Sequence, residues 1–271
     1  MATSLYLVNP ASDFATSFGA DALAAVGFPA AALMGDLPTA TLAALAPHDF
    51  TIELCDETLG PVDYDHPAEW VGITGKINQR RRLTVIADEF RRRGKRLVIG
   101  GPLASLSPDS LRPHCDVLVR GEVEDLAAEL FSDLRGGRPR AEYVGNRPDL
   151  AHSPPPRWDL YPNGRALLGV LQTSRGCPFE CEFCDVIQYL GRKQRHKPVG
   201  SVLAELEALH AMGYRAVFLA DDNFTVHRRR AKELLDAIAS WGRCHPTDLI
   251  TQVSIDAARD PELLEMCVRP V

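Results

Sequence analysis

The sequence predicts an α/β protein that contains two successive series of strands and helices. Three observations lead to this fold class. Short apolar runs alternate with stretches whose apolar residues recur at helical spacing, a proline-rich stretch over residues 145–164 interrupts the alternation, and the alternation then resumes. Strands that alternate with helices favour a parallel sheet covered on both faces. We therefore expect one domain over residues 1–144, a linker over 145–164, and a second domain over 165–271.

The first domain is expected to be a doubly wound, Rossmann-like sheet of the flavodoxin-like type, with about five strands. The expected strands are apolar runs followed by polar, proline or glycine residues, and they cover residues 5–8, 50–56, 70–75, 96–99 and 116–119. The expected helices cover residues 37–45, 77–93 and 125–134, with a further short helix near residue 110. The alanine-rich stretch over 14–34 is typical of part helix and part loop.

The stretch between the two domains is expected to form neither helix nor sheet. It contains Pro148, Pro154, Pro155, Pro156 and Pro162. Proline lacks a backbone N–H and fixes one backbone dihedral angle, so it interrupts both kinds of regular structure. A stretch of this composition is expected to act as a semi-rigid linker.

The second domain repeats the strand–helix pattern. The expected strands cover residues 167–171, 216–220 and 249–254, and the expected helices cover 202–212, 231–241 and the stretch from 261 onward. These units are too few to close a barrel. The domain is therefore expected to be the first half of a TIM-type (β/α) barrel, in a sequence that looks C-terminally truncated.

Composition and charge exclude several classes of protein. The chain carries 30 Lys and Arg against 36 Asp and Glu, a formal net charge of −6, which argues against a protein held on nucleic acid by general electrostatics. The N-terminal residues lack the basic and apolar regions of a signal peptide, and no apolar stretch is long enough to span a membrane. We expect a cytoplasmic protein. Seven cysteines, of which three are clustered, favour metal binding in a reducing compartment over a disulfide framework.

Three cysteines form the strongest chemical signal in the sequence. Cys177, Cys181 and Cys184 follow the expected strand at 167–171 in a C-x3-C-x2-C spacing. Thiolates are the usual ligands of iron–sulfur clusters, and a loop this short can direct three sulfurs to one point. Because three ligands leave one of four metal positions open, the spacing indicates a catalytic cluster. The alternatives are three buried thiols or a zinc knuckle, for which no nearby residue obviously supplies a fourth ligand.

This cysteine loop, after the first strand of an expected barrel, resembles the signature of the radical S-adenosylmethionine (SAM) enzymes. In that family the three cysteines hold a [4Fe-4S] cluster whose open iron is chelated by SAM. Phe183 stands where the family packs a side chain against the adenine of SAM. Polar residues after the second barrel strand hold the SAM ammonium in the family, and Asp221, Asp222 and Asn223 stand at that place. The family's usual Gly-Gly-Glu is absent, and capping of a helix is the alternative role for the two aspartates.

An α/β domain in front of this loop resembles the cobalamin-binding (B12) subgroup of the radical SAM family. The resemblance implies that cobalamin binds at the carboxyl ends of the first domain's strands, where open α/β sheets bind ligands and where glycines let the backbone approach a corrin. The Asp-x-His-x-x-Gly motif, whose histidine ligates cobalt in other B12 proteins, is absent. This absence implies cobalt without a protein histidine, or else a degenerate domain that binds nothing. The expected contacts are Asn9, Pro10, Thr74, Gly100, Gly101, Pro102, Gly121 and Glu122.

Within this subgroup the chain looks most like the branch that contains hopanoid methylases, on residues 172–177, 191–193 and 220–224. The resemblance implies a cobalamin-dependent radical SAM enzyme that generates a 5′-deoxyadenosyl radical and methylates an unactivated carbon of a lipid or another small metabolite. It also implies an electron donor such as ferredoxin or flavodoxin.

Three alternatives stay open at this point. One is a radical SAM enzyme that catalyses a cyclisation or rearrangement, and another is a non-catalytic corrinoid or iron–sulfur protein. The third is a methylthiotransferase, whose N-terminal domain holds another cluster on three further cysteines. Only Cys55 and Cys115 stand in that part of the sequence, which disfavours the third alternative.

Overall fold

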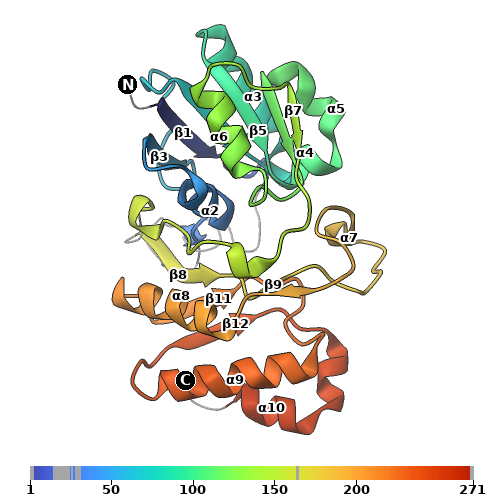
Figure 1. The fold of residues 1–271 in the computed structure, drawn as a ribbon. Helices are drawn as coiled ribbons and strands as arrows, with labels where there is room; N and C mark the ends of the chain where they lie inside the picture. Colours follow the sequence, from blue (N-terminus) through green and yellow to red (C-terminus); the bar gives the residue numbers. More distant parts are fainter. Residues whose placement is uncertain (1–2, 15–24, 26, 28–31, 163–164, 269–271) are drawn as a thin grey trace. The chain divides into compact units, whose positions relative to one another are not determined.

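The computed structural model describes residues 3–14, 25, 27, 32–162 and 165–268. The described residues form two compact units. The first contains residues up to 148 together with 154–166, and the second contains residues 149–153 together with those from 167 onward. Both units contain parallel strands and helices, so the predicted α/β class is confirmed (Figure 1).

The first unit is built on a parallel sheet whose described strands follow the order β3-β1-β4-β5-β6-β7. Without the short β2 (Ala32–Met34), this order is 2-1-3-4-5-6 along the chain, which extends the flavodoxin-like pattern. The predicted doubly wound sheet is therefore confirmed, with β7 as an additional strand. The strands are β1 (Thr3–Asn9), β3 (Phe50–Asp56), β4 (Trp70–Thr74), β5 (Arg96–Gly100), β6 (Val117–Arg120) and β7 (Glu142–Val144).

Helices follow most of these strands. The predicted helix over 77–93 begins with a 3-10 turn, η1 (Ile77–Gln79), and continues as α3 (Arg80–Arg92). The part helix and part loop expected over 14–34 falls largely outside the described residues. The remaining helices of the unit are α2 (Leu37–Leu45), α4 (Pro102–Leu106), α5 (Pro108–Leu111), the 3-10 turn η2 (Arg112–His114) and α6 (Ala127–Arg135).

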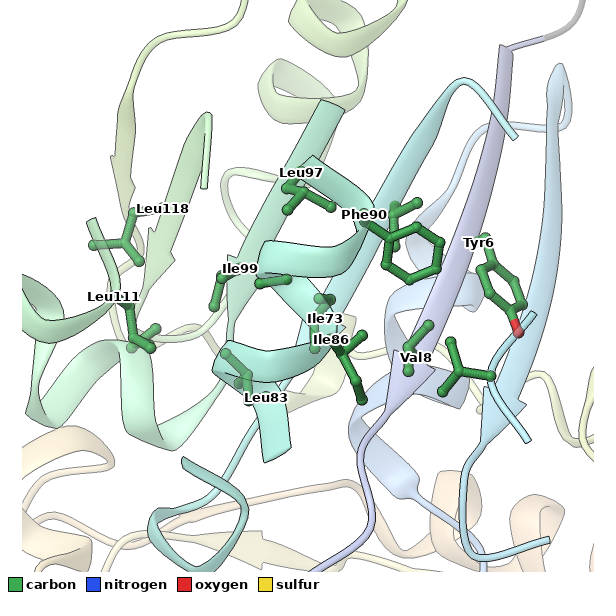
Figure 2. Packing of buried hydrophobic residues seen from close by; sticks show 14 of the residues in the cluster. Tyr6, Val8, Ile73, Leu83, Ile86, Phe90, Leu97, Ile99, Leu111 and Leu118 are labelled. Carbon is green, nitrogen blue, oxygen red and sulfur yellow. The ribbon is translucent and has the colours of Figure 1, made fainter. Parts of the chain in front are cut away.

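The two faces of the sheet carry separate apolar cores, because successive strand residues point to opposite faces. On one face, Tyr6 and Val8 pack with the α3 residues Leu83, Ile86 and Phe90 (Figure 2). The residue between them in β1 belongs to the other core, which also contains apolar residues of α6. Each face is thus covered by helices, and the carboxyl ends of the strands stay at one edge.

The proline-rich stretch is irregular apart from two 3-10 turns, η3 (Leu150–His152) and η4 (Trp158–Leu160). Its second part belongs to the first unit. The Tyr161 hydroxyl donates to Asp56 Oδ2 at 2.6 Å, and the Arg157 N–H donates to the Ala40 carbonyl at 3.0 Å. An added Cβ at Gly35 would lie only 2.8 Å from the Trp158 ring, so this stretch packs closely on the first unit.

The second unit contains three parallel strands in the order β12-β11-β8 among its described residues. A short antiparallel pair, β9 and β10, follows β8 and was not predicted. Among the described residues of the whole chain, no helix is long and apolar enough to cross a membrane. The strands are β8 (Ala166–Leu171), β9 (Ser174–Arg175), β10 (Arg195–His196), β11 (Ala216–Leu219) and β12 (Asp248–Thr251), and the helices are α7 (Val186–Tyr189), α8 (Val199–Ala211), α9 (Arg228–Gly242), η6 (Ile255–Arg259) and α10 (Pro261–Cys267).

Candidate functional site

The three clustered cysteines lie on one loop of the second unit, between β9 and α7. The loop follows the carboxyl end of β8, which is the end of a parallel strand where β/α barrels carry their sites. Cys177 is buried, Cys184 is partly buried, and Cys181 is exposed. The loop therefore has one buried thiol at its start and reaches solvent further along.

The start of the loop is held by the backbone of residues 191–193. Gly176 has a φ of +94°, and an added Cβ would lie 2.7 Å from the Lys193 carbonyl oxygen, so only glycine fits there. The next residue, Cys177, donates its N–H to the Gly191 carbonyl at 3.1 Å. Arg192 donates to the Pro178 carbonyl at 3.1 Å and pairs with Glu180 at 2.9 Å. Residues 191–193 thus hold the first part of the loop in place.

The chemistry of the loop fits an iron–sulfur cluster. Burial raises the pKa of the Cys177 thiol, a backbone hydrogen bond from Phe179 lowers it, and negative charge on Asp222 or on the other two thiols raises it further. Thiolates so placed repel one another, and bound iron would offset this repulsion. Among the described residues, no three His, Cys, Asp or Glu side chains already form a metal-binding group. The loop therefore supplies three thiol donors for such a cluster.

The first aspartate after β11 is bonded to the two residues Thr173 and Ser174, which precede the cysteine loop. Asp221 is 2% exposed. Its Oδ1 accepts the N–H groups of Thr173 at 2.6 Å and Ser174 at 3.1 Å, and its Oδ2 accepts their hydroxyls at 2.5 and 2.6 Å. Burial raises the pKa of the Asp221 carboxyl, and these four donors oppose the shift. The carboxylate thus binds the chain segment that leads into the loop.

The other residues expected to contact SAM have different surroundings. Asp222 accepts the N–H of Gly176 at 3.0 Å, so its carboxylate lies beside the first residues of the loop. The Asn223 amide donates to the Ser254 hydroxyl at 2.9 Å and accepts the Ser254 N–H at 3.3 Å, which ties it to the end of β12. Phe183 is 91% exposed. Of the three polar residues, Asp222 is the one that lies directly against the loop.

The residues expected to contact cobalamin follow neighbouring strands of the first unit, since β1, β4, β5 and β6 are adjacent in the sheet. Asn9 is buried, and its Oδ1 accepts from Gln79 Nε2 at 2.9 Å. The same Gln79 amide donates to the Pro10 carbonyl at 2.5 Å. Glu122 is also buried. Asn9 and Pro10 therefore already accept hydrogen bonds from the chain itself.

The chain's own packing requires two of the glycines at this edge. An added Cβ at Gly101, whose φ is +90°, would lie 2.6 Å from Thr74 Oγ1. At Gly121, whose φ is +74°, an added Cβ would lie 2.4 Å from the Gly145 carbonyl oxygen. Gly100 differs, because its added Cβ would meet Val119 only at an ordinary 3.6 Å. Glycine at 101 and 121 is thus explained without a ligand, and the cobalamin contacts stay a prediction.

Sequence reasoning missed a buried polar network beside the loop. Gln194 donates to the Ser174 hydroxyl at 3.0 Å and to the Asn223 carbonyl at 2.9 Å. Lys197 and Glu205 form an ion pair at 2.5 Å with both side chains under 5% exposed, and burial raises the pKa of Glu205 against the lowering effect of Lys197. A lysine and a glutamate at this separation are ordinary in sequence, so only the fold reveals the pair.

His196, at the end of β10, is expected to make stability depend on pH. Burial, with His227 and Arg230 nearby, lowers the pKa of His196 from 6.5 to about 4. The unfolded chain therefore takes up a proton on this residue below pH 6.5, whereas the folded chain does so only near pH 4. As pH falls through this window, the free energy of unfolding should fall by about 1 kcal/mol on account of this partly exposed ring.

Urea unfolding of the wild type and of His196→Gln across that window measures this contribution. The stability of the variant relative to the wild type should rise as the pH falls. A difference that stays constant from pH 7 to pH 4 would contradict the assigned shift.

Comparison with known proteins gives a family match over most of the second unit. Residues 171–268 match the model of the radical SAM superfamily. Over 247 residues the chain is 35% identical to an uncharacterized methyltransferase of Synechocystis sp., and this match covers 87% of the chain and 45% of that relative. Over 246 residues it is 30% identical to the hopanoid C-2 methylase of Rhodopseudomonas palustris, and this match covers 87% of the chain and 46% of that relative. The chain thus spans about half the length of the curated relatives that it matches.

Two solved structures share the fold. The cobalamin-dependent SAM radical enzyme OxsB, with aqua-cobalamin and SAM bound, gives a TM-score of 0.72 at 17% identity, over 98% of this chain and 42% of that one. The radical SAM methyltransferase TsrM from Kitasatospora setae, with cobalamin and a [4Fe-4S] cluster bound, gives a TM-score of 0.61 at 19% identity, over 90% of this chain and 52% of that one. The predicted combination of a Rossmann-like domain with part of a radical SAM barrel is therefore confirmed.

Proposed function

We propose that the chain is part of a cobalamin-dependent radical SAM enzyme that methylates an unactivated carbon of a small molecule, because residues 171–268 match the radical SAM superfamily. One observation carries this proposal. A three-cysteine loop follows the first strand of a β/α unit, and along the sequence this unit comes after a flavodoxin-like α/β unit. Relatives named as methyltransferases support the methyl transfer.

The cofactors of a radical SAM domain are SAM and a [4Fe-4S] cluster, which together supply a radical able to remove hydrogen from an unactivated carbon. Cys177, Cys181 and Cys184 would hold the cluster, because they are the thiols of the loop. The role of this chain is to fix the loop through Gly176 and to place the Asp222 carboxylate beside it. A carboxylate there suits the ammonium of SAM.

Cobalamin is proposed as the third cofactor. The support is the flavodoxin-like strand order of the first unit, which leaves polar and glycine residues at the carboxyl ends of four adjacent strands. Open α/β sheets bind ligands at that edge. Cobalamin is bound in the structures of OxsB and TsrM, and the fold that this chain shares with them supports the same cofactor here.

The substrate is proposed to be a lipid or another small metabolite. Two relatives are named for a hopanoid and for bacteriochlorophyllide d. Reduction of the cluster needs an electron donor, and ferredoxin or flavodoxin in the cytoplasm would supply the electron. A second candidate is a cyclisation or rearrangement, because the match to the radical SAM superfamily does not itself specify methyl transfer.

Binding of cobalamin to the purified chain tests this proposal. Gly100 is a suitable position for a blocking variant, because an added Cβ there meets Val119 only at an ordinary contact distance of 3.6 Å. We expect Gly100→Leu to weaken cobalamin binding by about tenfold or more, since the added side chain would occupy the ligand's edge of the sheet. The melting temperature should stay near that of the wild type.

Gly60→Leu is the matched control, because an added Cβ at Gly60 has no neighbour within 4 Å. Equilibrium dialysis with hydroxocobalamin gives the affinities. A wild-type chain that binds no cobalamin, or a Gly100→Leu chain that binds it as tightly as the wild type, would refute the cobalamin assignment. Detection of 5′-deoxyadenosine without S-adenosylhomocysteine in reaction mixtures would favour the second candidate.

A further inference from the structure

We propose that Asp221 is a positioning residue that fixes the start of the cysteine loop and that it does not bind the ammonium of SAM. The inference rests on the proposed function and deepens it, because it concerns the same cluster site. Asp221 comes two residues after β11, and Thr173 and Ser174 come after β8, the neighbour of β11 in the sheet. The three residues therefore meet at the carboxyl ends of two adjacent parallel strands.

The Asp221 carboxylate has no acceptor position left for a ligand. A carboxylate offers about four lone-pair positions. Here Oδ1 accepts two backbone N–H groups and Oδ2 accepts two hydroxyls, all from Thr173 and Ser174 at 2.5–3.1 Å. An ammonium could bind only after one of these buried donors had lost its partner, which is costly.

Ser174 connects the Asp221 carboxylate to residues 194–196. Ser174 pairs with His196 in the short β9–β10 sheet, and its hydroxyl also accepts from Gln194 at 3.0 Å. Thr173 accepts the N–H of Lys197 through its carbonyl at 2.8 Å. The carboxylate thus holds the segment that enters the loop, and that segment holds residues 194–197. Cys177 lies only three residues beyond Ser174, so a shift of Ser174 moves the first thiol.

Its neighbour Asp222 provides the contrast. Asp222 is partly exposed, whereas Asp221 is 2% exposed. Asp222 accepts the N–H of Gly176, inside the loop itself. The two consecutive aspartates therefore have different roles. Asp221 fixes the backbone that leads into the loop, and the Asp222 carboxylate lies beside the loop.

Two substitutions separate positioning from ligand binding. In Asp221→Asn the amide oxygen can accept the two backbone N–H groups, and the amide nitrogen can donate to the two hydroxyls, since a hydroxyl can also accept. This variant keeps the contacts and removes the charge. Asp221→Leu has a similar size and no acceptor, so two buried N–H groups and two hydroxyls lose the oxygen to which they donate. Asp248→Asn, at an exposed position of β12, is the control for loss of a negative charge.

The first measurement is amide hydrogen exchange of the metal-free chain. We expect the N–H groups of Thr173 and Ser174 to exchange slowly in the wild type, in Asp221→Asn and in Asp248→Asn. In Asp221→Leu they should exchange about tenfold faster or more. This measurement needs no cluster, so it tests the role of Asp221 even if the chain takes up no iron and the proposed function fails.

The second measurement is the EPR spectrum of the reduced, reconstituted protein with and without SAM. Asp221→Asn should take up iron within about twofold of the wild type and should keep the spectral change that SAM produces. Asp221→Leu should lose at least about fivefold in iron content.

Two outcomes would overturn the proposal. One is unchanged exchange at Thr173 and Ser174 in Asp221→Leu. The other is an Asp221→Asn protein with wild-type exchange and iron content whose spectrum no longer responds to SAM, because removal of the charge alone would then matter. If Asp221→Leu does not fold, Asp221→Asn still decides between the two roles.

Discussion

Replacing Cys177 with serine is expected to abolish iron–sulfur cluster binding by this chain. Cys177 is the buried thiol of the three, and its N–H is bonded to the Gly191 carbonyl, so its position is set by the surrounding chain. A serine hydroxyl stays protonated at neutral pH and is a poor ligand for iron, and two remaining thiols cannot hold the cluster. Iron bound per chain after anaerobic reconstitution should fall by about tenfold or more.

The control for this result is Cys244→Ser. Cys244 is an exposed free cysteine that follows α9 and lies outside the cysteine loop. Its variant should bind as much iron as the wild type. A Cys177→Ser chain that kept the wild-type iron and sulfide content would show that the cluster, if any, is held elsewhere.

Replacing Gly145 with alanine is expected to destabilise the first unit by about 3 kcal/mol. An added Cβ at Gly145 would lie 1.7 Å from the Glu122 carbonyl oxygen and 3.1 Å from Leu126 Cδ2. The Gly145 N–H also donates to the Arg120 carbonyl at 2.8 Å, so the backbone cannot move away without losing a β-sheet bond. Two pieces of backbone would have to separate at the end of β6.

Urea unfolding measures this effect, with Gly60→Ala as the matched control. An added Cβ at Gly60 has no neighbour within 4 Å, so that variant should stay within about 0.5 kcal/mol of the wild type. A Gly145→Ala chain as stable as Gly60→Ala would contradict the close packing of residues 122 and 145. The same crowding explains why glycine at the sheet edge is a weak sign of a ligand.

Local sequence signals predicted the fold where an element is long and apolar. In α3, Leu83, Ile86 and Phe90 recur at helical spacing, and all three are fully buried. The elements that were missed are short. β7 has three residues and β9 has two, too few to display a period of two, and their existence depends on pairing with β6 and β10.

The candidate site was predictable only in part, for a related reason. The spacing of the cysteines is a local feature, so it is legible in the sequence. The role of Asp221 depends on Thr173, which is 48 residues away along the chain and meets it only because β8 and β11 are neighbours. An aspartate pair after a strand therefore suggested a ligand contact, whereas the fold gives the first aspartate four donors from the chain itself.

Cys177, Cys181 and Cys184 are proposed to hold a [4Fe-4S] cluster with one iron open to SAM. Mössbauer and EPR spectroscopy of the anaerobically reconstituted chain can test this, beside a chain in which all three cysteines are replaced with alanine. We expect about four irons per wild-type chain, a spectrum that changes when SAM is added, and no cluster in the triple variant. A wild-type chain without a cluster, or a triple variant with the same cluster as the wild type, would contradict it.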